Sequence, residues 1–176
     1  MSPTRREALA QLAALAAASV LPFPEWRSVS ADPLDGTIAD FQAGRRRGHW
    51  SAAEVTARAL ERCRTDGARL HAIDALSDTA LAGARASDAR QRLGQLRGPL
   101  DGVPVFAKAI YDFDGLPTTG SNAEWARLFP DPVRRDSIEV ARLRAAGAVV
   151  LGKTNLSEGA AAGYNPAMDV PLNPWN

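Results

Sequence analysis

The stretch that decides the fold is Asp136-Ser-Ile-Glu-Val-Ala-Arg-Leu-Arg-Ala-Ala-Gly147-Ala-Val-Val-Leu-Gly-Lys-Thr154. Its first half opens with a capping-box pattern from Asp136 to Glu139 and predicts a helix that Gly147 closes as a C-terminal cap. The β-branched run after Gly147 predicts a short buried strand. A helix that leads directly into an apolar strand is typical of α/β layered proteins.

The same alternation extends toward the amino terminus. A short helix is expected from Pro33 to Arg47, and Ser51-Ala-Ala-Glu54 is a second capping box that opens the next helix. The run Leu70–Leu76 predicts a short strand, and Ser77-Asp78 caps a helix that continues to about Leu93. The apolar run Val103–Tyr111 predicts another strand. The repeated order of helices and strands supports the α/β class.

Length and composition bound the protein to one domain with a tail. The chain has 176 residues, of which 45% are hydrophobic, and 21 basic against 20 acidic residues give a net charge of +1. This balance argues against a dedicated nucleic-acid binder. The single cysteine, Cys63, excludes an intramolecular disulfide, and its helical position predicts a buried core residue. The two histidines, His49 and His71, have no sequence neighbours that suggest a metal site, so both are expected to be structural.

The amino terminus is expected to be a targeting segment. The pair Arg5-Arg6 precedes an alanine- and leucine-rich run from Ala8 to Leu21, which is too short to span a bilayer comfortably. Val29-Ser-Ala31 fits a small-residue cleavage site. These features predict a twin-arginine export signal over residues 1–31, a domain over residues 32–176, and a periplasmic or secreted protein without stable membrane insertion. The alternative is a plain amphipathic helix that opens the fold.

A lysine inside a predicted strand is the first candidate for chemistry. The chain has only two lysines, Lys108 and Lys153, and Lys108 lies among apolar residues. Burial lowers the pKa of a lysine, and an uncharged amine can act as a general base near neutral pH. The alternative is a lysine on an edge strand whose tip reaches solvent.

Three segments resemble the amidase signature family of serine hydrolases over residues 35–176. They are Gly98-Pro-Leu-Asp-Gly-Val-Pro-Val-Phe-Ala-Lys108, Gly115-Leu-Pro-Thr-Thr119 and the block from Asp136 to Glu158. The resemblance implies the amino-terminal, truncated part of an α/β/α fold with a mixed sheet flanked by helices. It also implies hydrolysis of a small-molecule linear or cyclic carboxamide by a Ser–cis-Ser–Lys triad, in which Lys108 is the lysine. No metal, organic cofactor or nucleic acid is expected, and assembly of identical copies is left open.

The chain departs from the family pattern in three places. Both triad serines are expected in a Gly/Ser-rich loop after Asn176, and no Gly-Gly-Ser-Ser or Gly-Ser-Ser-Ser run occurs in the 176 residues. We therefore expect no amidase turnover from this chain alone, and a non-catalytic or partner-bound fragment is the alternative. Asp101 stands where a histidine is common, and Ala109-Ile110 replaces an Asp-Asn pair. A tRNA-dependent amidotransferase subunit belongs to the same family, but an export signal would take the protein away from charged tRNA.

Two further patterns concern binding. The residues expected to form a wall of the substrate site are Thr118, Thr119, Gly120, Ser121 and Asn155. The segment Gly147–Thr154 matches the phosphate-loop pattern G-x-x-x-x-G-K-[ST], which makes nucleotide binding a minor alternative. Its apolar residues favour a strand over a flexible loop, so Lys153 is expected to position Thr154-Asn155 or simply to end the strand.

Overall fold

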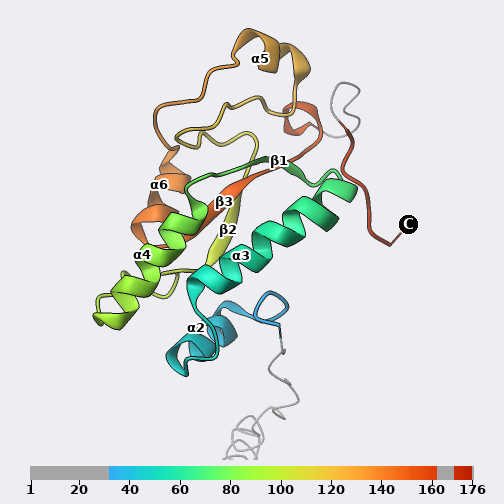
Figure 1. Cartoon of the computed structure of the whole chain (residues 1–176). Coiled ribbons are helices and arrows are strands. Elements are labelled where there is room, and N and C mark those ends of the chain that lie inside the picture. The colour runs from blue at the N-terminus through green and yellow to red at the C-terminus, as the bar shows by residue number, and fades with distance from the viewer. Residues whose placement is uncertain (1–31, 162–168, 176) are drawn as a thin grey trace, which may run out of the picture. The chain divides into compact units, whose positions relative to one another are not determined.

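The computed structural model describes residues 32–161 and 169–175. The predicted export signal over residues 1–31 lies outside them. No helix in the described ranges is long and apolar enough to cross a bilayer. Figure 1 shows the elements, which are α2 (Ile38–Arg46), α3 (Ala52–Arg62), the π-helical turn η1 (Cys63–Gly67), β1 (Ile73–Leu76), α4 (Ala80–Arg92), β2 (Pro104–Lys108), α5 (Ala123–Leu128), α6 (Ile138–Ala145), β3 (Val149–Thr154) and the 3₁₀ turn η2 (Glu158–Ala160).

The strands form a three-stranded mixed sheet in the order β1-β3-β2. The central strand β3 pairs antiparallel with β1 and parallel with β2. Lys108 at the end of β2 is paired with Thr154 at the end of β3. The carboxyl ends of the two parallel strands therefore lie side by side at the same end of the sheet. The mixed α/β architecture expected from the sequence is confirmed.

Helices cover both faces of β3. Val149 and Leu151 belong to one buried cluster, in which α2, α3 and α4 also take part, and α3 and α4 lie in front of the strands in Figure 1. Val150 points the other way and packs with Val140 of α6 and with Phe113. This alternation follows from the two-residue period of a strand. Because both faces are covered, all of β3 except its last residue is buried.

Helix starts were predicted with mixed accuracy. The helix expected from Pro33 begins at Ile38, with Thr37 as its cap. The expected cap Ser77-Asp78 is wrong, because α4 begins at Ala80 with Thr79 at the N-cap position and no side-chain cap hydrogen bond.

The capping box of Ser51 and Glu54 is confirmed, with both reciprocal hydrogen bonds present. For α6 the expected cap, Asp136, is wrong: Ser137 caps the helix. The carboxylate of Asp136 is held instead by an ion pair with Arg144, at 3.0 Å. The ion pair with Arg144 fixes the position of Asp136. A capping pattern compares residues three positions apart, so it does not include Arg144.

Two strands begin or end at other residues than the sequence suggested. The first begins at Ile73 and not at Leu70, because His71 has a positive φ of 51°, which interrupts extended chain. The second ends at Lys108. Cys63 is buried and His49 is exposed, as expected.

A fully buried carboxylate joins α4 to the turn before β2. Asp101 accepts hydrogen bonds from Arg90 at 2.9 and 2.8 Å and from the Ser87 hydroxyl at 2.5 Å. The Arg97 backbone amide donates a further bond of 2.8 Å. Burial acts to raise the pKa of Asp101, but the hydrogen bonds outweigh it, that from Arg90 most strongly, and the pKa falls to about 2. The position where the family often has histidine thus carries a buried ion pair in this chain.

Candidate active site

Lys108 is exposed, and the expectation that it would be buried is wrong for this structure. Its neighbours Ala107 and Ala109 are buried, at 5% and 0% exposure. The reason is the strand order. Among the described residues β2 pairs only with β3, so it is an edge strand. No described segment covers the side chain of its last residue, Lys108, which is therefore exposed to solvent. The ammonium of Lys108 makes no hydrogen bond or ion pair with any other described residue.

The predicted wall residues meet at the same edge of the sheet as Lys108. The Gly120 amide donates to the carbonyl of Ala109, next to Lys108, at 3.3 Å. The Ser121 hydroxyl donates to Asn155 Oδ1 at 2.8 Å, although the two residues are 34 positions apart. The Ser121 amide in turn donates to Thr119 Oγ1 at 3.2 Å. The loop that carries these residues is thereby fixed beside the carboxyl ends of β2 and β3.

Most polar groups of this wall are already engaged with protein. Asn155 donates from Nδ2 to the carbonyls of His71 and Asp169, at 2.9 and 2.7 Å. Thr119 and Ser121 are buried, at 6% and 0% exposure. These hydrogen bonds hold the side chains of the wall in position within the protein. That the five residues touch a substrate stays a prediction.

The buried lysine of the structure is Lys153. Its side chain is fully buried, and Nζ donates to the carbonyl of Pro117 at 2.6 Å and to Thr118 Oγ1 at 2.8 Å. Burial lowers the pKa of Lys153, and the nearby carboxylates of Asp74 and Asp112 oppose this shift. Conversely, burial raises the pKa of Asp74, while Lys153 acts to lower it. Lys153 therefore ties the 117–121 loop to β3.

The phosphate-loop interpretation of residues 147–154 is wrong. Gly147 ends the helix α6, and the residues after it form β3, so no flexible loop is available to surround a phosphate. The ammonium of Lys153 points inward to Pro117 and Thr118. The expected link from Lys153 to its neighbours Thr154 and Asn155 is replaced by a contact with a distant loop. Like Lys108, Lys153 lies in an apolar run, and it is the central position of β3, covered on both faces, that buries it.

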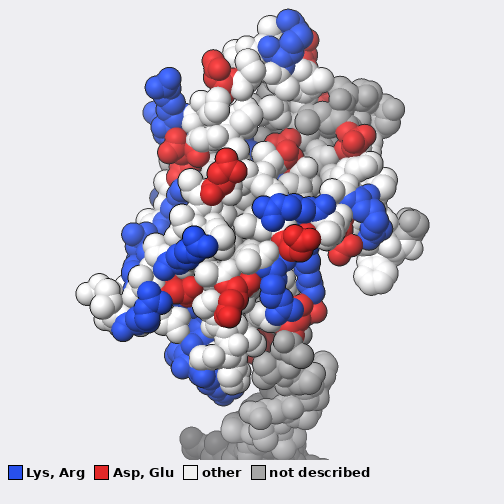
Figure 2. All heavy atoms as spheres, viewed as in Figure 1, with Lys and Arg blue, Asp and Glu red and all other residues white. Residues whose placement is uncertain are grey.

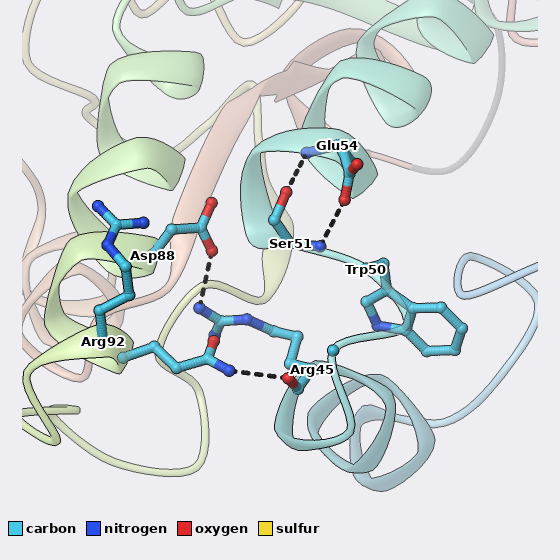
Figure 3. Close-up of a pocket in the computed structure, with 8 residues that line it drawn as sticks. Arg45, Trp50, Ser51, Glu54, Asp88 and Arg92 are labelled. Carbon is cyan, nitrogen blue, oxygen red and sulfur yellow. Dashed lines mark hydrogen bonds and ion pairs between the residues drawn. The ribbon is translucent and has the colours of Figure 1, made fainter.

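Lys108 does not line either of two surface hollows that residues in the described ranges form. One of about 400 Å³ opens where α2, α3 and α4 meet (Figure 3). The lining groups of this hollow are largely paired with one another. Asp88 binds Arg45 at 3.1 Å, and the Ser51–Glu54 capping box forms one side. Asp88 also accepts from the amides of Ala52 and Ala53 at the start of α3. This hollow is a helix junction rather than a reactive centre.

A smaller hollow lies next to the candidate site. It has a volume of about 200 Å³ and is lined in part by His71, Asp74 and Asn155. Within the described ranges, no three histidine, cysteine, aspartate or glutamate side chains are grouped so that they could hold a metal ion.

Figure 2 shows both charge signs interspersed on the face drawn, with arginines gathered where α2 and α4 end.

Comparison with known proteins gives a consistent result. The family model described as Amidase matches residues 54–176. A glutamyl-tRNA(Gln) amidotransferase subunit from Salinispora arenicola is 42% identical over 153 residues, which cover 85% of this chain. The native peptide amidase from Stenotrophomonas maltophilia is 36% identical over 78% of the chain, with a TM-score of 0.61. A vestigial protein complex related to the origin of an s-triazine catabolic enzyme is 30% identical over 80% of it, with a TM-score of 0.72.

These relatives are much longer than the chain. It spans 29% of the amidotransferase subunit, 26% of the peptide amidase and 31% of the third protein.

Proposed function

Because the chain belongs to the amidase signature family, we propose that it is the amino-terminal part of an amidase that hydrolyses a small linear or cyclic carboxamide. In this proposal Lys108 is the lysine of a Ser–cis-Ser–Lys triad, and both serines lie outside residues 1–176. No metal or organic cofactor takes part. The 176-residue chain by itself does not turn over amides.

The proposed chemistry is acyl transfer to serine. The uncharged amine of Lys108 takes a proton from the bridging serine, which takes one from the nucleophilic serine. The nucleophile attacks the amide carbon, and backbone amides of the serine loop stabilise the oxyanion. The C–N bond then breaks, the amine leaves with a proton, and water hydrolyses the acyl-enzyme.

The observation that carries the proposal is the position of Lys108. It ends a parallel strand, beside a loop anchored by Lys153 and Asn155, and the described residues leave its amine without a partner. Functional residues of α/β proteins commonly lie at the carboxyl ends of parallel strands. A lysine acts as a base only in its uncharged form, which burial favours. The proposal therefore requires a further segment that covers Lys108.

The test begins with the coding sequence downstream of Asn176. If it encodes a Gly/Ser-rich loop, the longer protein is expressed and ammonia release is measured with a panel of linear and cyclic carboxamides. Replacing Lys108 by Ala or Arg is expected to lower kcat/KM by about 10² to 10⁴, the usual contribution of a general base. Arg92→Gln, on the exposed end of α4, is the matched control for loss of one charge.

Four results would contradict the proposal. The isolated 176-residue chain could release ammonia in a Lys108-dependent manner, which would place the whole catalytic group within it. The longer protein could keep full activity in Lys108→Ala. A stop codon directly after Asn176 would favour the non-catalytic fragment. Release of ammonia from glutamine only in the presence of charged tRNA would favour an amidotransferase subunit, the activity in the name of the Salinispora relative.

We further propose that residues 1–31 are a twin-arginine export signal. Replacing both Arg5 and Arg6 by Lys is expected to retain the protein in the cytosol. Mass spectrometry of the periplasmic fraction should find an amino terminus near Asp32. An intact Met1 found only in the cytosolic fraction would overturn this.

A further inference from the structure

Three arginines converge on a hollow at the end of the sheet opposite Lys108. The hollow has a volume of about 330 Å³, and its lining consists of Gly83, Ala86, Arg90, Arg97, Arg144, Gly147 and Ala148. Gly147 and Ala148 directly precede β3, whereas Lys108 is level with its last residue. A strand rises by about 3.3 Å per residue, so the hollow lies roughly 20 to 23 Å from Lys108.

Each guanidinium is held by a contact that leaves part of its donor set unused. Arg90 binds the buried carboxylate of Asp101 through Nε and Nη2. Arg97 donates from Nη1 to the carbonyl of Arg144 at 3.1 Å. The guanidinium carbon of Arg144 stacks 4.5 Å from the centre of the Phe113 ring. Four guanidinium nitrogens have no hydrogen-bond partner among the described residues. They are Nη1 of Arg90, Nη2 of Arg97 and both Nη atoms of Arg144.

Arg90 and Arg144 are each paired with a carboxylate that does not line the hollow, and the carboxyl group of Asp101 lies close to Gly147, which does. Asp101 has no exposed surface, and the side chain of Asp136, beside Arg144, is 14% exposed. Neither lines the hollow, and no other acidic residue does. Arg97 is exposed and has no acidic side-chain partner in the described ranges. The opening therefore presents donors and positive charge, without a competing carboxylate.

From this arrangement we propose that the hollow binds a phosphate group, carried by a small phosphate ester. Guanidinium forks match the oxygens of phosphate and form charge-assisted hydrogen bonds with them. The small lining residues leave room beside the arginines, since a Cβ atom added at Gly83 would meet nothing within 4 Å. A volume of about 330 Å³ exceeds that of a free anion and lies at the lower end of small-molecule sites, about 300 to 1,000 Å³.

The test is calorimetric titration of the 176-residue chain with inorganic phosphate and with phenyl phosphate, at constant ionic strength. We expect saturable binding of both, with phenyl phosphate the tighter, and at least tenfold weaker binding in Arg97→Gln. That substitution keeps the bond from the Arg97 backbone amide to Asp101, so the fold should persist. Arg85→Gln, an exposed position on α4 outside the hollow, is the matched control and should change binding less than twofold.

Nuclear magnetic resonance locates the binding independently of the variants. The amide signals of Gly147 and Ala148 should shift as phosphate is added. Absence of saturation, equal loss in Arg85→Gln, or binding that leaves these two amides unmoved would each overturn the proposal. Equal binding of benzoate and phenyl phosphate would also overturn it, because the hollow would then be selective for charge alone.

Discussion

Protonation of Asp101 should remove about 2.5 kcal/mol from the stability of the fold. The carboxyl has a pKa of about 2 in the folded protein, against 3.8 for an unperturbed aspartate. The difference of about 1.8, at 1.36 kcal/mol for each pKa unit, gives about 2.5 kcal/mol. Since the folded pKa is the lower one, this stabilisation is complete above about pH 5. It is lost as the pH falls through about 4 and toward 2.

Urea unfolding of the wild type and of Asp101→Asn between pH 7 and pH 2 measures this effect. Asparagine does not titrate, so other carboxylates cancel in the difference between the two proteins. At pH 7 the variant should be less stable by at least about 2.5 kcal/mol, because Arg90 loses its buried partner. By pH 2 the difference should shrink by about 2 kcal/mol.

Asp66→Asn is the control for loss of a carboxylate on the surface. Its ion pair with Arg69 is 67% and 65% exposed, so its removal should change stability by no more than about 0.5 kcal/mol. The reasoning fails if the difference between wild type and Asp101→Asn stays constant from pH 7 to pH 2. It also fails if the two variants behave alike.

The strands and their lysines support three further predictions. Gly152→Ala should destabilise the fold by at least about 2 kcal/mol, because a Cβ there would lie 2.1 Å from the carbonyl oxygen of Ala75. Gly83→Ala, in open space on α4, should stabilise it by up to about 1 kcal/mol, and urea midpoints compare the two. At pH 8, acetic anhydride should label Lys108 much faster than Lys153, as read by mass spectrometry, and equal labelling in the folded protein would contradict the burial of Lys153. Because burial lowers the pKa of Lys153, the stability of the wild type relative to Lys153→Met should rise as pH rises toward 10.5, and a fall over that range would refute the assignment.

The local features of the fold were readable because neighbouring residues encode them. A serine followed three positions later by a glutamate begins α3, and Gly147 ends α6 with a positive φ of 88°. Such caps depend on hydrogen bonds within one turn, so short-range patterns suffice. Where a distant partner intervenes, as Arg144 does at Asp136, the local pattern fails by one residue.

The family motifs likewise singled out Lys108 and the 118–121 loop before any contact was known. They could not say that Ser121 would bind Asn155, or that Pro117 and Thr118 would receive the ammonium of Lys153, since those partners are 34 to 36 positions apart.

What the sequence by itself determined is the succession of the helices and strands apart from the short helix α5, and the family to which it is similar. What only the tertiary structure decided is which lysine is buried. Both lysines lie in apolar strands, and their local patterns are alike. The strand order places β3 in the centre and β2 at an edge of the described sheet, so Lys153 is enclosed and Lys108 reaches solvent. Strand order is set by the packing of segments far apart in the chain, which no local pattern records.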